Sequence, residues 1–298
     1  MTATAFRIAF LGFGEAAEAM ARGLNGDGIS ATFSAFDVKS DGPDAAAMHA
    51  RMAANSVACA NAPSKACDDA DVIFSLVTAD QAETAARSVA ATGLDGALYL
   101  DCNSCAPDTK RRAGALIEAA GGRYVDVAIM TPIHPKLHKS PCLIAGSHAE
   151  PARDLMRDLG MNAEIAGNEI GHASVRKMIR SVMVKGLEAL TLECFLAARA
   201  AGIEKDVMSS LDGSYPGFDW PRRAPYMIER ALTHGTRRAM EMDEVAKTLR
   251  DLGIEPQMVS ATVARQRQAG ALNLDAGTIG PENITALTGA ILAGIRPQ

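Results

Sequence analysis

The chain has 298 residues, a formal net charge of −5 and a hydrophobic fraction of 48%, which suits two domains with large cores. The absence of a clustered basic patch argues against a nucleic-acid partner, and no apolar run reaches the roughly 18 residues that cross a bilayer, so we expect no membrane partner. Six cysteines in so long a chain do not make a disulfide framework, and we expect reduced thiols in a cytoplasmic protein.

The first half of the chain alternates short apolar segments with amphipathic ones. This pattern predicts strands followed by helices, and hence an α/β fold with a doubly wound parallel sheet that is covered on both faces. The predicted strands are residues 6–12, 29–37, 71–77, 97–102, 123–129 and 141–146, and the predicted helices are residues 15–24, 79–90, 107–120 and 150–160.

From residue 169 onward the pattern is helical, with no convincing strand. The predicted helices are residues 169–200, 204–211, 222–233, 238–252, 256–269 and 281–294. We therefore expect a dinucleotide-binding domain over residues 1–167. An all-helical domain for substrate binding and dimerisation follows over residues 168–298, and the long interdomain helix covers about residues 169–200.

The first predicted strand runs into "LGFGEAA", in which Gly12, Gly14 and Ala17 form the pattern G-x-G-x-x-A directly before a helix. That context is typical of a Rossmann-type dinucleotide-binding turn. The first glycine makes the tight turn, the second lets the backbone approach a pyrophosphate, and the helix N-terminus offers N–H groups to the phosphates. The residues expected to contact the cofactor here are Gly12, Phe13, Gly14, Glu15 and Ala16.

The second predicted strand ends in Asp37, near the expected spacing for the acid that accepts hydrogen bonds from the adenosine ribose. A carboxylate there repels a 2′-phosphate and favours NAD, whereas Lys39 leaves NADP possible. Ligands of open parallel sheets lie beyond the carboxyl ends of the strands. Further cofactor contacts are therefore expected at Val77, Thr78 and Asn103.

Cys102 and Cys105 form a C-x-x-C pattern at one of these strand ends. A redox role requires a thioredoxin-like setting, and a zinc site requires a second pair of ligands. Neither context is visible, so we expect small buried side chains and no metal.

Four segments, "GFGEAAEAMARGL", "DVIFSLVTADQ", "LDCNSCAPDT" and "GHASVRKMIRS", follow one another along the chain. In these segments the chain resembles the β-hydroxyacid dehydrogenase family, which includes 3-hydroxyisobutyrate and 6-phosphogluconate dehydrogenases. Its later segments resemble an uncharacterised phosphogluconate-dehydrogenase-like branch. The resemblance covers most of the chain and implies an NAD(P)-dependent dehydrogenase that acts on the CH–OH group of a small hydroxy acid, and a homodimer.

The resemblance also implies roles for single residues. Lys177 matches the general acid/base lysine, and Ser181 replaces an asparagine that usually binds substrate beside it, with Arg180 next to both. Asn103 and Ser104 match residues near the nicotinamide and the substrate. Met130, Thr131 and Pro132 stand where relatives have a substrate-binding Ser-Gly-Gly turn, so the way the substrate is held stays open. Trp220, in a small aromatic cluster, is either core or a substrate-pocket wall.

Oxidation of a secondary alcohol needs a hydride acceptor and a base for the hydroxyl proton. A lysine serves as that base only when its pKa falls from about 10.4 toward neutrality, as burial and a nearby cation make it do. Lys177 and Arg180 lie one helical turn apart, and two such cations favour an anionic substrate. Two alternatives stay open: an imine reductase-type enzyme, although those proteins generally lack the lysine, and a non-catalytic dinucleotide-binding regulator. Decarboxylation of the product is also open.

Overall fold

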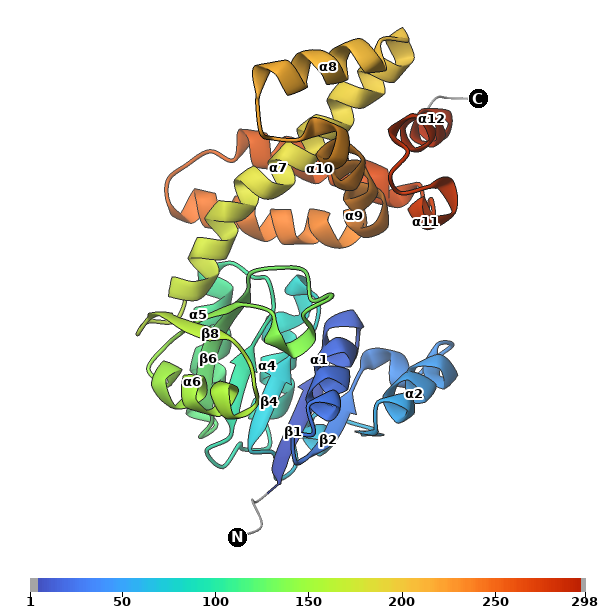
Figure 1. Ribbon diagram of the computed structural model, residues 1–298. Helices are drawn as coiled ribbons and strands as arrows, with labels where there is room; N and C mark the ends of the chain where they lie inside the picture. The colour runs from blue at the N-terminus through green and yellow to red at the C-terminus, as the bar shows by residue number, and fades with distance from the viewer. Residues whose placement is uncertain (1–4, 296–298) are drawn as a thin grey trace. The chain divides into compact units, whose positions relative to one another are not determined.

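The computed structural model describes residues 5–295, and the chain divides into two compact units, residues 1–178 and 179–298. The first unit is a sheet flanked by helices and the second is helical (Figure 1). The division falls within helix α7 (His172–Ala201). Among the described residues, no helix combines the length and the apolar character needed to span a membrane.

Within the described residues, the sheet of the first unit has eight strands in the order β3-β2-β1-β4-β5-β6-β7-β8. The first six positions follow the 3-2-1-4-5-6 order of a dinucleotide-binding sheet, which confirms the predicted fold class. Neighbouring strands are parallel except for β6 and β7, which are antiparallel. The strands are β1 (Phe6–Leu11), β2 (Ala31–Phe36), β3 (Val57–Cys59), β4 (Val72–Ser75), β5 (Leu98–Asp101), β6 (Arg123–Ile129), β7 (Cys142–Ala145) and β8 (Ala163–Gly167).

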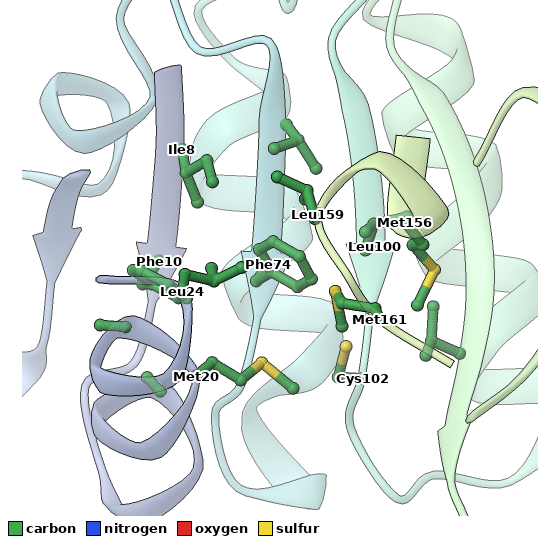
Figure 2. Packing of buried hydrophobic residues seen from close by; sticks show 14 of the residues in the cluster. Ile8, Phe10, Met20, Leu24, Phe74, Leu100, Cys102, Met156, Leu159 and Met161 are labelled. Atoms are coloured by element: carbon green, nitrogen blue, oxygen red, sulfur yellow. The ribbon is translucent and has the colours of Figure 1, made fainter. Parts of the chain in front are cut away.

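Alternate residues of β1, β4, β5 and β6 supply two cores, one on each face of the sheet. Ile8 and Phe10 belong to the core beneath α1 (Glu15–Gly26) and α6 (Ala149–Asp158). Figure 2 shows Phe10 and Phe74 together with Met20 in this core, and the two phenyl rings stack with their centroids 5.7 Å apart. The opposite core contains Ala9 and Leu11 with residues of α4 (Ala82–Ala90) and α5 (Pro107–Ala119).

Several short elements of the first unit were not predicted. They are β3, β8, α2 (Ala45–Ala54) and α3 (Pro63–Cys67). A three-residue strand and a five-residue helix are too short to show a period. The predicted helix 79–90 begins as a 3₁₀ turn, η2 (Ala79–Gln81), and becomes α-helical at Ala82.

As far as residue 295, the second unit consists of the rest of α7 and five further helices. Its core contains Leu192 and Phe195 of α7, Ile228 of α9 and Leu287 of α12, all fully buried. The helices are α8 (Glu204–Ser214), α9 (Trp220–Asp251), α10 (Gln257–Ala271), α11 (Ala276–Ile279) and α12 (Ile284–Ile295).

Helix α9 corrects one prediction, because the expected break between 222–233 and 238–252 does not occur. Gly235 lies in the middle of α9 and allows close contact with α10. A Cβ atom at Gly235 would lie 2.4 Å from the carbonyl oxygen of Gln266, and one at Gly270 would lie 2.3 Å from the amide nitrogen of Thr236. Gly235, which lies in the expected break, therefore permits two helix backbones to touch.

Candidate active site

The glycine turn, residues 12–14 between β1 and α1, contains two glycines with different purposes. Gly12 has a φ of +83°, and a Cβ atom there would lie 2.7 Å from the carbonyl oxygen of Leu76. Both the positive φ and the close carbonyl oxygen of Leu76 require glycine at this position. Gly14 has an ordinary φ of −83°, and a Cβ atom there would meet nothing within 4 Å among the described residues. Internal packing does not explain Gly14, whereas close approach of a pyrophosphate does.

Asp37 is fixed beside the glycine turn by two backbone hydrogen bonds. The N–H of Phe13 donates to Oδ2 at 2.7 Å, and the N–H of Lys39 donates to Oδ1 at 2.9 Å. The Phe13 side chain is fully buried in the core, so only its backbone is available to a ligand. The structure therefore places a carboxylate at the end of β2, where a dinucleotide fold binds the adenosine ribose.

The other predicted contacts near the turn differ in exposure. Val77 lies against Gly12, since a Cβ atom on Gly12 would be 3.1 Å from Cγ1 of Val77. Thr78 is exposed just before η2, Glu15 is exposed in the first turn of α1, and Ala16 is half-buried against the core. Glu15 and Thr78 are accessible to a ligand, whereas Ala16 offers mainly its backbone.

The pairing register of β4, β5 and β6 places three polar residues side by side. Ser75 of β4 pairs with Asp101 of β5, and Asp101 pairs with Asp126 of β6. Asn103, just beyond β5, donates from Nδ2 to Asp101 Oδ1 at 2.7 Å and to Ser75 Oγ at 2.9 Å. Only the amide nitrogen can donate to a carboxylate, so the orientation of the amide is determined.

Asn103 Oδ1 is buried, and it has no hydrogen-bond partner within the described part of the chain. Buried polar atoms are normally paired. An orphaned acceptor at a strand end suits a ligand that brings an N–H or O–H group, such as the carboxamide of a nicotinamide or the hydroxyl of a substrate.

Lys177 lies in the second turn of α7, still within the first unit. Its Nζ donates to Ser104 Oγ at 2.6 Å, and both side chains are half-buried. The residues are 73 positions apart, so the fold itself joins the candidate proton-transfer lysine to the end of β5. Lys177 is thus next to Ser104, which follows Asn103 directly.

A buried ionic cluster supports this strand end, and we call it the strand-end network: Asp101, Asn103, Lys110, Tyr124 and Asp126. Nζ of Lys110 contacts the backbone oxygen of Asp101 at 2.6 Å, Asp101 Oδ1 at 3.0 Å and Asp126 Oδ1 at 3.5 Å. Tyr124 donates to Asp101 Oδ2 at 2.6 Å. Burial lowers the pKa of Lys110, but the carboxylates of Asp101 and Asp126 outweigh burial and raise that pKa above its usual value. The lysine therefore stays charged.

Asp126 also caps the start of α7. Its Oδ2 accepts from the N–H of Gly171 at 3.1 Å, and from the N–H and hydroxyl of Ser174 at 3.0 and 3.1 Å. A carboxylate at this position pairs orphan N–H groups and opposes the positive end of the helix dipole. Within the strand-end network, sequence reasoning predicted a role for Asn103 alone and missed the other four residues. The available signal was an acid near the end of the predicted strand 97–102 and another within the predicted strand 123–129, with a lysine in the helix between them.

Arg180 and Ser181 belong to the second unit. Arg180 is exposed, whereas Ser181 is buried and accepts from Lys185 Nζ at 3.3 Å. Burial lowers the pKa of Lys185, Glu241 opposes that fall, and the charges of Arg238, Arg237 and Arg180 add to it. The catalytic roles suggested for Arg180 and Ser181 stay predictions.

The segment after β6, where relatives have their substrate-binding turn, leads into a loop that packs on α1. Thr131 and Pro132 are exposed, whereas Met130 is half-buried and its N–H donates to the Pro141 carbonyl at 2.9 Å. Farther along, His138 is buried against Gly23 of α1, and its Nε2 lies 3.2 Å from Asp27 Oδ2. Contact of residues 130–132 with a substrate also stays a prediction.

Trp220 lies in the hydrophobic core of the second unit, with only 8% of its surface exposed. Its ring contacts Phe218, with centroids 4.5 Å apart, and Tyr215 edge-on. This is the core interpretation that the sequence left open. Cys102 and Cys105 are buried free thiols, and burial raises the pKa of Cys102 well above its ordinary value.

Two families match parts of the chain. Residues 7–104 match the family described as NADP oxidoreductase coenzyme F420-dependent, and residues 198–269 match a domain of unknown function, DUF1932. An uncharacterised 28.5 kDa protein of Methanothermus fervidus is 28% identical over 165 residues, which cover 55% of this chain and 63% of that protein. The chain therefore spans less than two thirds of this curated relative.

Solved structures match nearly the whole chain. A conserved hypothetical protein from Sinorhizobium meliloti 1021 is 35% identical, with a TM-score of 0.72 and 98% of both chains covered. MTH1747, a protein of unknown function described as similar to 3-hydroxyacid dehydrogenases, is 29% identical, with a TM-score of 0.67 over 98% of this chain and 100% of its own. A 3-hydroxyisobutyrate dehydrogenase from Salmonella typhimurium shares the fold at 17% identity, with a TM-score of 0.69 over 95% and 99% of the two chains.

Proposed function

The chain belongs to the β-hydroxyacid dehydrogenase family, a family of NAD(P)-dependent oxidoreductases, and on that premise we propose that it transfers a hydride between a nicotinamide and a small hydroxy acid. The reaction interconverts the secondary alcohol and the carbonyl of the substrate, and Lys177 carries the proton. The observation that supports this most directly is the 2.6 Å contact between Lys177 Nζ and Ser104 Oγ. This contact holds an amine just beyond the carboxyl end of β5. In the sheet, β5 lies next to β4, and β4 lies next to β1, which leads into the glycine turn.

The residues that would hold the dinucleotide are those of the glycine turn and Asp37. The open space over Gly14 leaves room for a pyrophosphate, which the N–H groups at the start of α1 would bind. Asp37 would accept hydrogen bonds from the ribose hydroxyls, and its charge supports NAD over NADP. When bound, the nicotinamide supplies the hydride acceptor for alcohol oxidation.

Proton transfer is the task of this chain's own side chains. In the oxidation direction the neutral amine of Lys177 takes the proton of the substrate hydroxyl, and in reduction its ammonium returns a proton to the carbonyl oxygen. Ser104 accepts a hydrogen bond from the amine and so orients it. Lys177 and Arg180 are three positions apart in the sequence, and these two positive charges are our reason to propose an anionic substrate.

A substrate panel tests the proposal. Turnover of small hydroxy acids is measured with NAD and with NADP for the wild type, for Lys177→Met and for the control Lys65→Met, a surface lysine in the same unit. We expect oxidation of at least one compound, a loss of about 1,000-fold in kcat for Lys177→Met, and no change for Lys65→Met. Binding of NAD without turnover of any compound would instead identify a non-catalytic regulator.

We also propose that the protein is a homodimer. Ile179, Met183 and Leu190 of α7 follow one another at helical spacing and are 50%, 70% and 60% exposed. Such an apolar stripe favours burial against another protein surface. Light scattering should give twice the chain mass for the wild type and a smaller mass for Met183→Glu, and a monomeric wild type would contradict the proposal.

A further inference from the structure

The strand-end network buries three charged side chains, which stabilisation of a hydrophobic core does not require. Lys110 is 0% exposed, and its ammonium lies between two carboxylates that are 1% and 0% exposed. Burying three charges is costly, and apolar side chains of similar volume often stabilise a core as well or better. The network therefore invites a functional explanation.

Each carboxylate of the network holds a different part of the candidate site. Asp101 accepts from both the backbone N–H and the side-chain amide of Asn103, at 3.0 and 2.7 Å. Asp126 accepts from the N–H groups of Gly171 and Ser174 at the start of α7. Lys177 follows Ser174 by three residues, which is close to one helical turn. The ammonium of Lys110 links the two carboxylates.

We propose that Lys110 is a positioning residue, whose ammonium holds Asp101 and Asp126 together and thereby fixes Asn103 and Lys177 relative to each other. It acts through its two carboxylate partners. Its catalytic consequence rests on the function proposed above, whereas its effect on the start of α7 does not.

The charge balance explains why a lysine suits this position. Asp101 and Asp126 are paired residues on adjacent strands, and two buried carboxylates so close repel each other unless a cation lies between them. An apolar residue at position 110 would leave that repulsion uncompensated. The strand ends would then separate, or the carboxylates would take up protons and lose acceptor strength. Either change displaces Asn103 and loosens the first turn of α7.

The test combines two measurements on the full-length protein, with Lys110→Met as the main variant. Hydrogen–deuterium exchange reports on the amides of residues 171–174, and steady-state kinetics reports on kcat, KM and cofactor affinity. We expect exchange at these amides to rise at least tenfold, because local opening sets exchange rates. We expect kcat to fall about 100-fold, as misplacement by about 1 Å can cause.

Milder variants keep the test decisive if Lys110→Met does not fold. Ser174→Ala removes one donor to Asp126, and Tyr124→Phe removes one donor to Asp101. The matched control is Ser88→Ala, whose hydroxyl donates to a carbonyl of its own helix at 2.8 Å. Ser174→Ala should raise exchange at residues 171–174 and lower kcat about tenfold, and Ser88→Ala should do neither.

Folded Lys110→Met, or folded Ser174→Ala in its place, with wild-type exchange at residues 171–174 and wild-type kcat overturns the proposal. A lower melting temperature with unchanged kcat and exchange also overturns it, because that is the signature of a purely structural ion cluster. If the wild type oxidises no hydroxy acid, the proposed function fails by itself. The exchange measurement then still decides whether Lys110 holds the start of α7.

Discussion

The glycine turn and the strand-end network lie along the same edge of the sheet and are built in opposite ways. The glycine turn works by leaving space: a Cβ atom at Gly14 would meet nothing within 4 Å among residues 5–295. The strand-end network works by filling space, because Lys110, Asp101 and Asp126 have almost no exposed surface. A methyl group added at Gly14 should therefore impair the glycine turn, whereas removal of one of the buried charges should impair the strand-end network.

The two glycines of the turn give the sharpest test of this comparison, since the same substitution should have two different results. Gly14→Ala should fold normally and bind the dinucleotide roughly 30-fold more weakly, because the methyl group occupies the space of the pyrophosphate. Gly12→Ala should lose on the order of 2 kcal/mol of unfolding free energy, because alanine is strained at a φ of +83°. Fluorescence titration with NADH and urea unfolding measure the two effects.

Each glycine variant serves as the control for the other. If Gly14→Ala destabilises the protein and leaves cofactor affinity unchanged, Gly14 has a structural role and the space above it is not a binding site. If Gly12→Ala is as stable as the wild type, the backbone at that position has more freedom than the structure indicates.

Ser104→Ala tests the network side of the site with a smaller expected effect. The variant loses the acceptor that lies 2.6 Å from Lys177 Nζ. A hydrogen bond to a charged group contributes about 1.5–3 kcal/mol, so kcat should fall about tenfold or more. NAD affinity should not change. Equal kcat for the wild type and Ser104→Ala would show that the amine needs no orienting partner.

The substitution Asp37→Asn, beside the glycine turn, tests the choice between NAD and NADP. Asparagine can still accept the Phe13 N–H, but it lacks the charge that repels a 2′-phosphate. The ratio of kcat/KM for NAD to that for NADP should fall about fivefold, as one exposed charge pair allows. Asp41→Asn, at an exposed residue nearby, is the control. An unchanged ratio would mean that Asp37 does not select the cofactor.

The smallest expected effect concerns the loop that packs on α1. Burial lowers the pKa of His138, and the charge of Asp27 only partly opposes this. A histidine with a lowered folded pKa stabilises the fold above its unfolded pKa of about 6.5 and loses that contribution as pH falls. The wild type should therefore lose slightly more stability between pH 7.5 and 5 than His138→Gln does. Parallel curves of melting temperature against pH would contradict this.

The glycine turn was predictable because its chemistry is local in the chain. The turn is three consecutive residues between a strand and a helix, and Asp37 follows 24 residues after Phe13. The strand-end network was not predictable in the same way. Asp126 and Ser174 are 48 residues apart, and Lys110 stands in a run of charged residues that is typical of a solvated helix face.

Two features of the fold escaped prediction for similar reasons. The antiparallel direction of β7 depends on a loop whose path has no pattern in the sequence. The expected break at residues 234–237 does not occur, and Gly235 in that segment is required by its contact with α10, a separate helix. Local sequence patterns predicted most of the helices and strands. The direction of β7 and the contact between α9 and α10 depended instead on residues that are distant in the chain.

The contact between Gly235 and Gly270 has a consequence for how this protein tolerates change. Backbone atoms of one helix occupy the position of a side chain on the other, so even a methyl group would push the helical axes apart. In a saturation library that scores only folded protein, both positions should accept glycine alone, while exposed neighbours such as Arg237 accept many residue types. The two glycines, whose side chains are single hydrogen atoms, should thus tolerate the fewest substitutions in the second unit.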